Sequence, residues 1–350
     1  LTVSGGGPLP PGTPRGDCLE SGSTLRFMLP LALALGGGGE FLTRGRLSQR
    51  PLGPYAALFE EKGIALAQEE GAVRVSGKLA PGRFSLPGDV SSQFVTGLLL
   101  ALPLLSGDSE IHLTTDPESE GYIHLTLDVL AAFGVRVEQR SRRAFFVPGG
   151  QGYRPRAYAV EGDYSQAAVM LCAGALGSGV WVKGLAPDSR QGDRAAVSLL
   201  EAMGARAQRR GDALCIKGEK LSGIAFDGGQ CPDILPMMAL VCALARGESR
   251  IENAGRLRLK ESDRLAATLE ELGRLGAHVR GEGDALCITG QERLAGGVAA
   301  DCHGDHRIAM MLSVAALACR APITLRGAEC VAKSWPGYWE QYALLGGKIT

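Results

Sequence analysis

Five nearly all-apolar stretches of the chain share one pattern: each opens on a polar residue and closes on small residues or glycine. They begin at Ser23, Ser91, Ser165, Asp233 and His306, so that successive starts are 68, 74, 68 and 73 residues apart. A helix that is apolar almost all round is typical of a buried element. The regular interval therefore predicts a repeated unit that opens on a buried helix.

Each interval holds a second pattern, an amphipathic helix that ends at a glycine and is followed by alternating apolar and polar residues. The four glycines are Gly63, Gly134, Gly204 and Gly276. Glycine at that place is typical of a left-handed helix end, and alternation with period two predicts strands. The unit is therefore predicted to run helix, strand, helix, strand, strand, strand. Its second helix, for instance over residues 193–203, keeps a charged face toward solvent.

The chain has 350 residues, more than one hydrophobic core usually serves, which predicts two domains. Residues 1–16 match the closing hairpin of the unit, and the last copy stops one strand into its own hairpin. Six units in two groups of three fit both ends, with the first unit mostly missing. We expect an incomplete N-terminal domain over 1–161, holding the end of unit 1 with units 2 and 3, and a C-terminal domain over 162–350, holding units 4 to 6.

Charge and composition argue against several classes of protein. The 37 basic and 37 acidic residues cancel, so the chain has no overall field for holding nucleic acid or an anionic membrane. Its longest apolar stretches are too short to span a bilayer. The nine cysteines are scattered and show no metal-ligand spacing with the five histidines. We expect a cytoplasmic monomer with reduced cysteines, no metal, and no nucleic-acid or membrane partner.

The starts of the buried helices carry different chemical groups, although they occupy equivalent places in the repeat. Residues 20–23 read Glu-Ser-Gly-Ser, 91–93 read Ser-Ser-Gln, and 305–307 read Asp-His-Arg. A helix N-terminus with hydroxyl groups suits a phosphate or carboxylate. Serine and aspartate are also the commonest N-caps, so a capping role and a binding role both stay open for each.

Residues 256–264 hold the densest cluster of charge. Lys260 and Arg264 are four apart, which would place them on one helical face, with Glu261 adjacent and Asp263 available as a cap. One interpretation is an exposed, salt-bridged first turn, and the other is an anion site. His306 and Arg307 favour the anion, because the helix dipole disfavours cations at an N-terminus.

Five motifs then occur in an order that resembles the 5-enolpyruvylshikimate-3-phosphate synthase family of enolpyruvyl transferases. They read ESGSTLR, SSQF, KESDR, GDHRIAM and CVAKSWPGYWEQ. The resemblance implies an α/β (α+β) fold, a two-domain inside-out α/β barrel built from repeated βαβαββ units, with the active site in the cleft between the domains. It also implies a step of the shikimate pathway, which leads to chorismate and aromatic amino acids and is the target of glyphosate.

The implied reaction transfers the enolpyruvyl group of phosphoenolpyruvate to the 5-hydroxyl of shikimate 3-phosphate by addition and elimination, with no cofactor. By resemblance, shikimate 3-phosphate contacts Ser91, Ser92, Gln93, Ser119, Tyr122, Asp233, Arg256 and Lys260. Phosphoenolpyruvate contacts Gly22, Ser23, Arg46, Gln93, Arg264, His306, Arg307 and Lys333. Asp233, Glu261 and Lys333 are the implied catalytic residues, as carriers of the proton at C3 or of the hydroxyl proton.

Two alternatives stay open. The sister enzyme that acts on UDP-N-acetylglucosamine shares the repeat, but many of its members use a cysteine near the place of Gly45 and Arg46, and this chain has no cysteine between Cys18 and Cys172. The chain could also be a non-catalytic module that binds shikimate 3-phosphate. The family's N-terminal lysine, serine and arginine, which contact both substrates, have no counterpart here, so we expect the chain by itself to be a poor catalyst.

Overall fold

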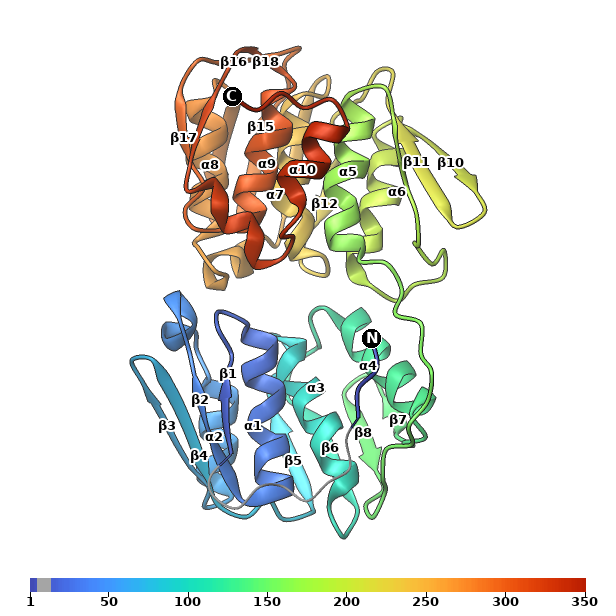
Figure 1. Ribbon diagram of the computed structural model, residues 1–350, viewed down its shortest axis with the longest axis vertical. Coiled ribbons are helices and arrows are strands. Elements are labelled where there is room, and N and C mark those ends of the chain that lie inside the picture. Colours follow the sequence, from blue (N-terminus) through green and yellow to red (C-terminus); the bar gives the residue numbers. More distant parts are fainter. Residues whose placement is uncertain (5–13) are drawn as a thin grey trace. The chain divides into compact units, whose positions relative to one another are not determined.

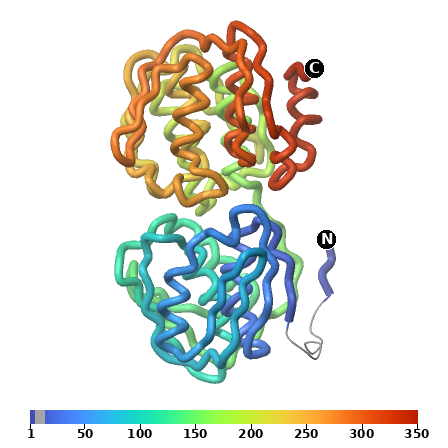
Figure 2. Tube along the Cα trace, turned by 90° about the vertical axis from the view of Figure 1, so that its left-hand side faces the viewer, coloured from blue at the N-terminus to red at the C-terminus, as the bar shows by residue number. Residues whose placement is uncertain are grey.

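The computed structural model describes residues 1–4 and 14–350. Its internal contacts divide the chain into two compact parts, each of which holds several of the predicted repeats. These parts are named unit 1 (Leu1–Tyr158) and unit 2 (Ala159–Thr350). The chain passes from one to the other once, through the exposed residues 152–160 (Figure 2). The predicted hairpin over 1–16 lies partly outside the described residues. Residues 1–4 form no strand, and the first described strand is β1 (Arg15–Asp17).

Unit 1 holds two four-stranded sheets of the same topology (Figure 1). The first has the order β1-β2-β4-β3, with β2 (Gly38–Leu42), β3 (Ala65–Glu69) and β4 (Ala72–Ser76). The second has the order β5-β6-β8-β7, with β5 (Arg83–Leu86), β6 (Ser109–Leu113), β7 (Glu138–Ser141) and β8 (Ala144–Val147). In each sheet the first two strands are parallel and the other pairs antiparallel.

Helices connect these strands in βαβαββ order. In unit 1 they are α1 (Gly22–Gly36), η1 (Gly45–Gln49), α2 (Gly53–Glu61), α3 (Ser92–Ala101), η2 (Leu102–Leu104) and α4 (Glu120–Ala132). The parallel pairs β1-β2 and β5-β6 are joined through α1 and α3, as a parallel connection requires a crossover. The predicted mixed α/β fold built from repeats is confirmed.

Unit 2 repeats this topology in the sheet β12-β13-β15-β14, formed by β12 (Ala225–Asp227), β13 (Glu248–Glu252), β14 (His278–Glu282) and β15 (Ala285–Thr289). A three-stranded sheet, β10-β11-β9, contains β9 (Val180–Val182), β10 (Arg206–Arg210) and β11 (Ala213–Lys217). Two short parallel pairs complete it: β16 (Leu294–Gly296) with β18 (Cys319–Ala321), and β17 (Ala299–Asp301) with β19 (Thr324–Arg326). The helical segments are η3 (Gly192–Arg194), η4 (Pro232–Ile234), η5 (Gly255–Leu259), η6 (Ala328–Lys333), α5 (Tyr164–Leu176), α6 (Ala195–Ala202), α7 (Leu235–Ala243), α8 (Arg264–Arg274), α9 (His306–Ala316) and α10 (Tyr338–Leu344).

Four of the five predicted buried helices are confirmed, as α3, α5, α7 and α9, whereas in α1 only 7 of the 15 residues are buried and Met28 and Leu35 are exposed. In α7 every residue is buried, and in α9 all but the last are. Helices α1 and α3 lie side by side in unit 1, as do α5, α7 and α9 in unit 2 (Figure 1). Because these helices form the centre of each core, their N-termini gather polar groups at one place within each unit.

The predicted glycine ends of the second helices are also confirmed. Gly63, Gly134, Gly204 and Gly276 follow α2, α4, α6 and α8 with φ of 67°, 82°, 100° and 91°. This left-handed conformation costs glycine little and other residues more. Within the described residues, no helix is both long and apolar enough to cross a membrane.

Two predicted strands are absent from the described structure. The copy that opens with α3 has no third closing strand, since residues 148–163 carry no strand. Pro148 and Pro155 lack the N–H groups that a sheet ladder needs, and most of this segment is exposed. Residues 347–350, expected to begin a hairpin, form no strand either.

Gly97 lets α1 and α3 approach closely. A Cβ on Gly97 would lie 2.3 Å from the Tyr55 hydroxyl and 2.4 Å from the Arg26 carbonyl oxygen. That hydroxyl donates hydrogen bonds to the carbonyls of Arg26 and Phe94, at 3.0 and 2.9 Å, so it ties the two helices together.

We expect Gly97→Ala to lower the free energy of unfolding by roughly 1–3 kcal/mol, because the added methyl displaces Tyr55 or separates the helices. Gly273→Ala is the matched control, since it is exposed in α8 and a Cβ there meets nothing within 4 Å. That change should be neutral or stabilise by up to about 1 kcal/mol. Urea unfolding followed by circular dichroism measures both, and an equal effect of the two substitutions would contradict the packing argument.

Candidate active site

Arg264 is the centre of the charged cluster in unit 2. Its side chain is 3% exposed, and it makes ion pairs with three carboxylates from different elements. Nε lies 2.7 Å from Asp305, Nη1 2.8 Å from Asp233, and Nη2 3.0 Å from Glu261. Ser262 donates a further hydrogen bond of 3.0 Å to Asp305. One guanidinium therefore contacts three buried or half-buried carboxylates and offsets part of their negative charge.

The prediction that Lys260 and Arg264 share one face of a helix is wrong. Lys260 ends η5 in extended backbone, and α8 begins only at Arg264, with Asp263 as the predicted N-cap. The two cations nevertheless meet at one atom, because Lys260 Nζ lies 2.9 Å from the Asp233 oxygen that Arg264 also contacts. The interpretation as an exposed, salt-bridged first turn is also wrong, because Arg264 is buried and Lys260 is largely buried.

The cluster changes the protonation of its members. Burial raises the pKa of Asp233, but Lys260, Arg264 and Arg307 outweigh it and hold that pKa well below its usual range. Burial likewise raises the pKa of Glu261, and His306 with Arg264 brings it down to about 2. Burial lowers the pKa of Lys260. Both carboxylates are therefore ionised at neutral pH and can accept a proton.

The start of α9 supplies the two predicted cations. Its N-cap, Asp305, is fully buried and accepts a 2.9 Å hydrogen bond from the Arg307 N–H. His306 Nδ1 lies 2.8 Å from Glu261. Arg307 is 8% exposed and donates from Nη1 to the Ser165 carbonyl at 2.7 Å. Its buried Nε has no hydrogen-bond partner among the described residues, which leaves it available to an anionic ligand.

The remaining predicted residues of unit 2 lie on two loops beside the cluster. Lys333 ends η6, and its Nζ donates to the Gly304 carbonyl at 2.9 Å, directly before Asp305. Arg256 lies in η5 and donates to the Gly229 carbonyl at 3.4 Å. Lys333 is exposed, as a lone lysine in a loop usually is, and it contacts the loop that leads into α9.

In unit 1 the helix starts are joined by an arginine. Ser91 is the N-cap of α3 and accepts a hydrogen bond from the Gln93 N–H, at 3.3 Å. The Gln93 side chain accepts a 2.6 Å hydrogen bond from Arg26 of α1, whose side chain is almost fully buried. The N-cap of α1 is Ser21 rather than Ser23, which lies in the first turn.

Gly22 lies against two guanidinium groups that the sequence analysis did not select. A Cβ on Gly22 would lie 2.6 Å from Arg50 Nη1 and 3.0 Å from Arg26 Nη1. Arg46, the residue selected there, is exposed in η1. The spacing of Arg26 could have indicated it, since it follows Gly22 by one helical turn. Arg50 gave no such signal, because the path of the chain through η1 decides which arginine of this loop turns inward.

Ser119 and Tyr122 lie at the start of α4. Ser119 is buried and adopts φ of 54°, a left-handed conformation that is uncommon outside glycine. Helix α4 is joined to α3 by a 2.9 Å hydrogen bond between the hydroxyls of Thr96 and Thr126. The starts of α3 and α4 thus carry five of the eight residues predicted for shikimate 3-phosphate. The predicted cleft between the two domains stays a prediction.

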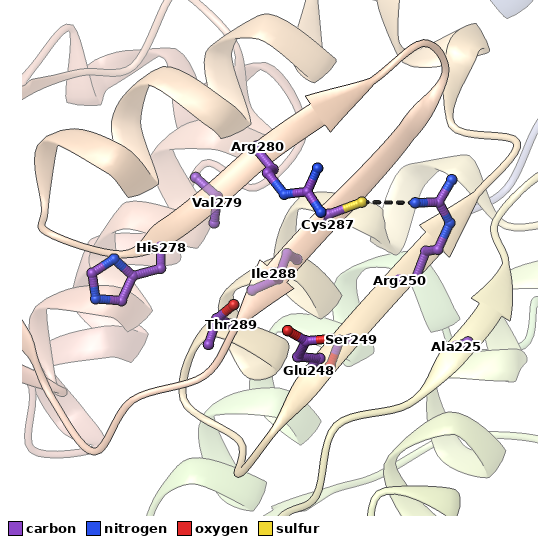
Figure 3. A pocket seen from close by; sticks show the side chains of 10 residues that line it. All are labelled: Ala225, Glu248, Ser249, Arg250, His278, Val279, Arg280, Cys287, Ile288 and Thr289. Atoms are coloured by element: carbon purple, nitrogen blue, oxygen red, sulfur yellow. Dashed lines mark hydrogen bonds between the residues drawn. The ribbon is translucent and has the colours of Figure 1, made fainter.

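Glu261, Asp305 and His306 are near enough to one another to be considered as metal ligands. Arg264, however, contacts both carboxylates and supplies the positive charge that a cation would. A cavity of about 540 Å³ lies elsewhere, on the sheet that contains β13, β14 and β15 (Figure 3). Arg250, Cys287 and Arg280 lie across those strands there, and none of the predicted site residues lines it.

Comparison with known proteins agrees with this geometry. A family profile described as EPSP synthase (3-phosphoshikimate 1-carboxyvinyltransferase) matches residues 1–342. The chain belongs to the EPSP synthase family. A protein of Clostridium botulinum (strain Eklund 17B / Type B) named 3-phosphoshikimate 1-carboxyvinyltransferase is 45% identical over 336 residues, 95% of this chain and 78% of the relative. A protein of the same name from Clostridium perfringens (strain ATCC 13124) is 46% identical over 334 residues, 95% of this chain and 78% of that one.

Solved structures of the EPSP synthase fold are similar as well. EPSP synthase from Acinetobacter baumannii superposes with a TM-score of 0.77 at 25% identity, covering 95% of this chain and 79% of the other. The enolpyruvyl transferase NikO of Streptomyces tendae, at 20% identity, gives a TM-score of 0.75 over 93% of this chain and 76% of its own. The second likeness concerns the fold alone.

The low pKa of Glu261 predicts a pH dependence of stability. Its value is about 2 in the folded protein and 4.5 ordinarily, so ionised Glu261 stabilises the fold above about pH 4.5 and this stabilisation is lost as pH falls toward 2. In urea unfolding between about pH 2 and 5, the free energy of unfolding should fall less steeply for Glu261→Gln than for the wild type. Glu60→Gln, on the exposed side of α2, should keep the wild-type slope. Identical slopes for all three proteins would refute the assignment.

Proposed function

We propose that this protein is a 3-phosphoshikimate 1-carboxyvinyltransferase, which transfers the enolpyruvyl group of phosphoenolpyruvate to the 5-hydroxyl of shikimate 3-phosphate and releases phosphate. The observation that carries the proposal is one charged cluster in a chain of the EPSP synthase family: Asp233 and Glu261 contact Arg264, Lys260 contacts Asp233, and His306 contacts Glu261. The curated relatives carry the shikimate name, which favours this substrate over UDP-N-acetylglucosamine.

Asp233 is suited to accept the proton of the 5-hydroxyl. It is ionised, and Lys260 and Arg264 both contact its Oδ1 atom. The same cations would hold the ring hydroxyls and the carboxylate in a fixed arrangement, so that the attacking oxygen and its base are positioned before reaction. As Asp233 takes the proton, the hydroxyl oxygen forms its bond to C2 of phosphoenolpyruvate.

Glu261 and Lys333 are suited to the proton at C3. Glu261 lies between His306 and Arg264, and Lys333 reaches the loop just before His306. In the addition step a proton goes to C3 while the oxygen attacks C2. In the elimination step the C2–O bond to phosphate breaks, and C3 returns its proton to the carrier.

Phosphoenolpyruvate carries a phosphate and a carboxylate, and each unit offers cations for them. In unit 2, the buried Nε of Arg307 has no hydrogen-bond partner among the described residues. In unit 1, we assign the role predicted for Arg46 to Arg50, because Arg50 and Arg26 lie against Gly22 at the start of α1. Guanidinium forks bind both kinds of anion well. The cytoplasmic location and the monomeric state predicted from the sequence belong to the same proposal.

Titration followed by a turnover assay tests the activity. Shikimate 3-phosphate should bind the protein, and adding phosphoenolpyruvate should release phosphate and form the enolpyruvyl ether, even at a low rate. Asp233→Asn should change binding by less than about tenfold and lower turnover by roughly 10². Asp212→Asn, in an exposed hairpin turn, is the matched control. Binding without any phosphate release would instead favour the non-catalytic module.

Substitutions at Arg50 and Arg46 test which of the two arginines binds phosphoenolpyruvate in unit 1. Arg50→Ala should raise the KM for phosphoenolpyruvate by about tenfold or more, since it removes a charged hydrogen-bond donor beside Gly22. Arg46→Ala removes the same charge from an exposed position and should have the smaller effect. Steady-state kinetics with varied phosphoenolpyruvate measures both, and a larger effect at Arg46 would restore the assignment made from sequence.

A further inference from the structure

Two buried cysteines, Cys302 and Cys330, share a side-chain hydrogen bond beside the candidate active site. Cys302 follows β17 and is fully buried, and Cys330 lies in η6 and is 7% exposed. Both are free thiols. The segments that carry them are held together, because β17 pairs in parallel with β19 and the Cys302 N–H donates to the Arg326 carbonyl at 2.9 Å.

The two thiols have different reactivity. A hydrogen bond from Cys302 lowers the pKa of Cys330, helped by the positive charge of Lys333 and opposed by burial, Asp305 and Glu329, whereas the pKa of Cys302 is raised. The thiolate is the nucleophilic form of cysteine. Cys330 is therefore the attacking sulfur, and Cys302 is the thiol placed to react with it next. Another neighbouring pair, Cys172 and Cys242, lies in the helical core, and burial raises the pKa of both.

We propose that Cys302 and Cys330 form a reversible disulfide on exposure to a hydroperoxide, and that this bond switches off the active site. The Cys330 thiolate attacks one peroxide oxygen and becomes a sulfenic acid, and the other oxygen leaves as water after taking a proton. The Cys302 sulfur then attacks the sulfenic sulfur, and a second water leaves. Two thiols and one hydrogen peroxide thus give one disulfide and two waters.

The bond would act on candidate catalytic residues, and this part of the inference rests on the proposed function. Cys302 lies three residues before Asp305, which caps α9 and holds Arg264. Cys330 lies three residues before Lys333, which donates to the Gly304 carbonyl. A disulfide brings its sulfur atoms to about 2 Å, closer than a hydrogen bond does, so the bond would draw the two segments together. A displacement of about 1 Å at catalytic groups can lower turnover by roughly 10².

Peptide mass spectrometry tests the bond without reference to activity. The protein is treated with hydrogen peroxide, its remaining thiols are alkylated after denaturation, and it is digested without reduction. We expect a cross-linked peptide pair that contains Cys302 and Cys330 and separates with dithiothreitol. Cys302→Ser and Cys330→Ser should abolish it, and Cys319→Ser, at a partly exposed cysteine of β18, should leave it unchanged. No such pair in the wild type, or an equal yield of Cys330 cross-linked to a different cysteine in Cys302→Ser, would overturn the proposal.

Turnover then tests the switch. Peroxide should lower phosphate release by the wild type at least about tenfold, dithiothreitol should restore it, and Cys330→Ser should keep its rate under peroxide. A complete cross-link with unchanged turnover would overturn the switch while leaving the bond. Failure of the proposed function gives a different result, since the reduced protein would then release no phosphate although the cross-link still forms.

Discussion

The rest of the site depends on the burial of one guanidinium. Asp233, Glu261 and Asp305 come from three separate segments, and three carboxylates this close together would repel one another strongly or take up protons. Arg264 contacts all three and, together with Lys260, Arg307 and His306, lets them stay ionised away from water. Removing one member of such a cluster leaves uncompensated buried charge, which is why these residues must be considered together. The same arginine fixes how η4, α8 and α9 begin relative to one another.

The repeated fold explains where the chemistry lies, and the differences between repeats explain what it is. Every repeat places the start of its first helix at the same point of the topology, where free N–H groups and a positive dipole end favour anions. At that point Ser92 and Gln93 open α3, Asp233 precedes α7, and His306 and Arg307 open α9. One scaffold thus presents hydroxyl, carboxylate and cationic groups without any change of fold.

Local patterns in the sequence predicted the helices and their ends well, because burial and left-handed caps depend on nearby residues. The buried helices and the position of Gly63 and its equivalents follow from apolar periodicity alone. Features that depend on the path of the chain were not predictable in this way. Lys260 meets Asp233 from extended backbone, and Arg50 rather than Arg46 reaches Gly22, because 3₁₀ turns shift the register of each loop. The missing strand over 148–163, by contrast, has a local cause in Pro148 and Pro155, which the sequence already shows.

The charge balance of the cluster bears on how substrate binding could make Asp233 a stronger base. Asp233 is a poor proton acceptor while Lys260 and Arg264 both neutralise it. An anionic substrate that draws on the same cations would share their charge, and the pKa of Asp233 would rise toward its ordinary value. Proton affinity at the base would then increase only when substrate is bound. The ion pairs that stabilise the free protein would thereby link substrate binding to the readiness of the carboxylates to carry protons.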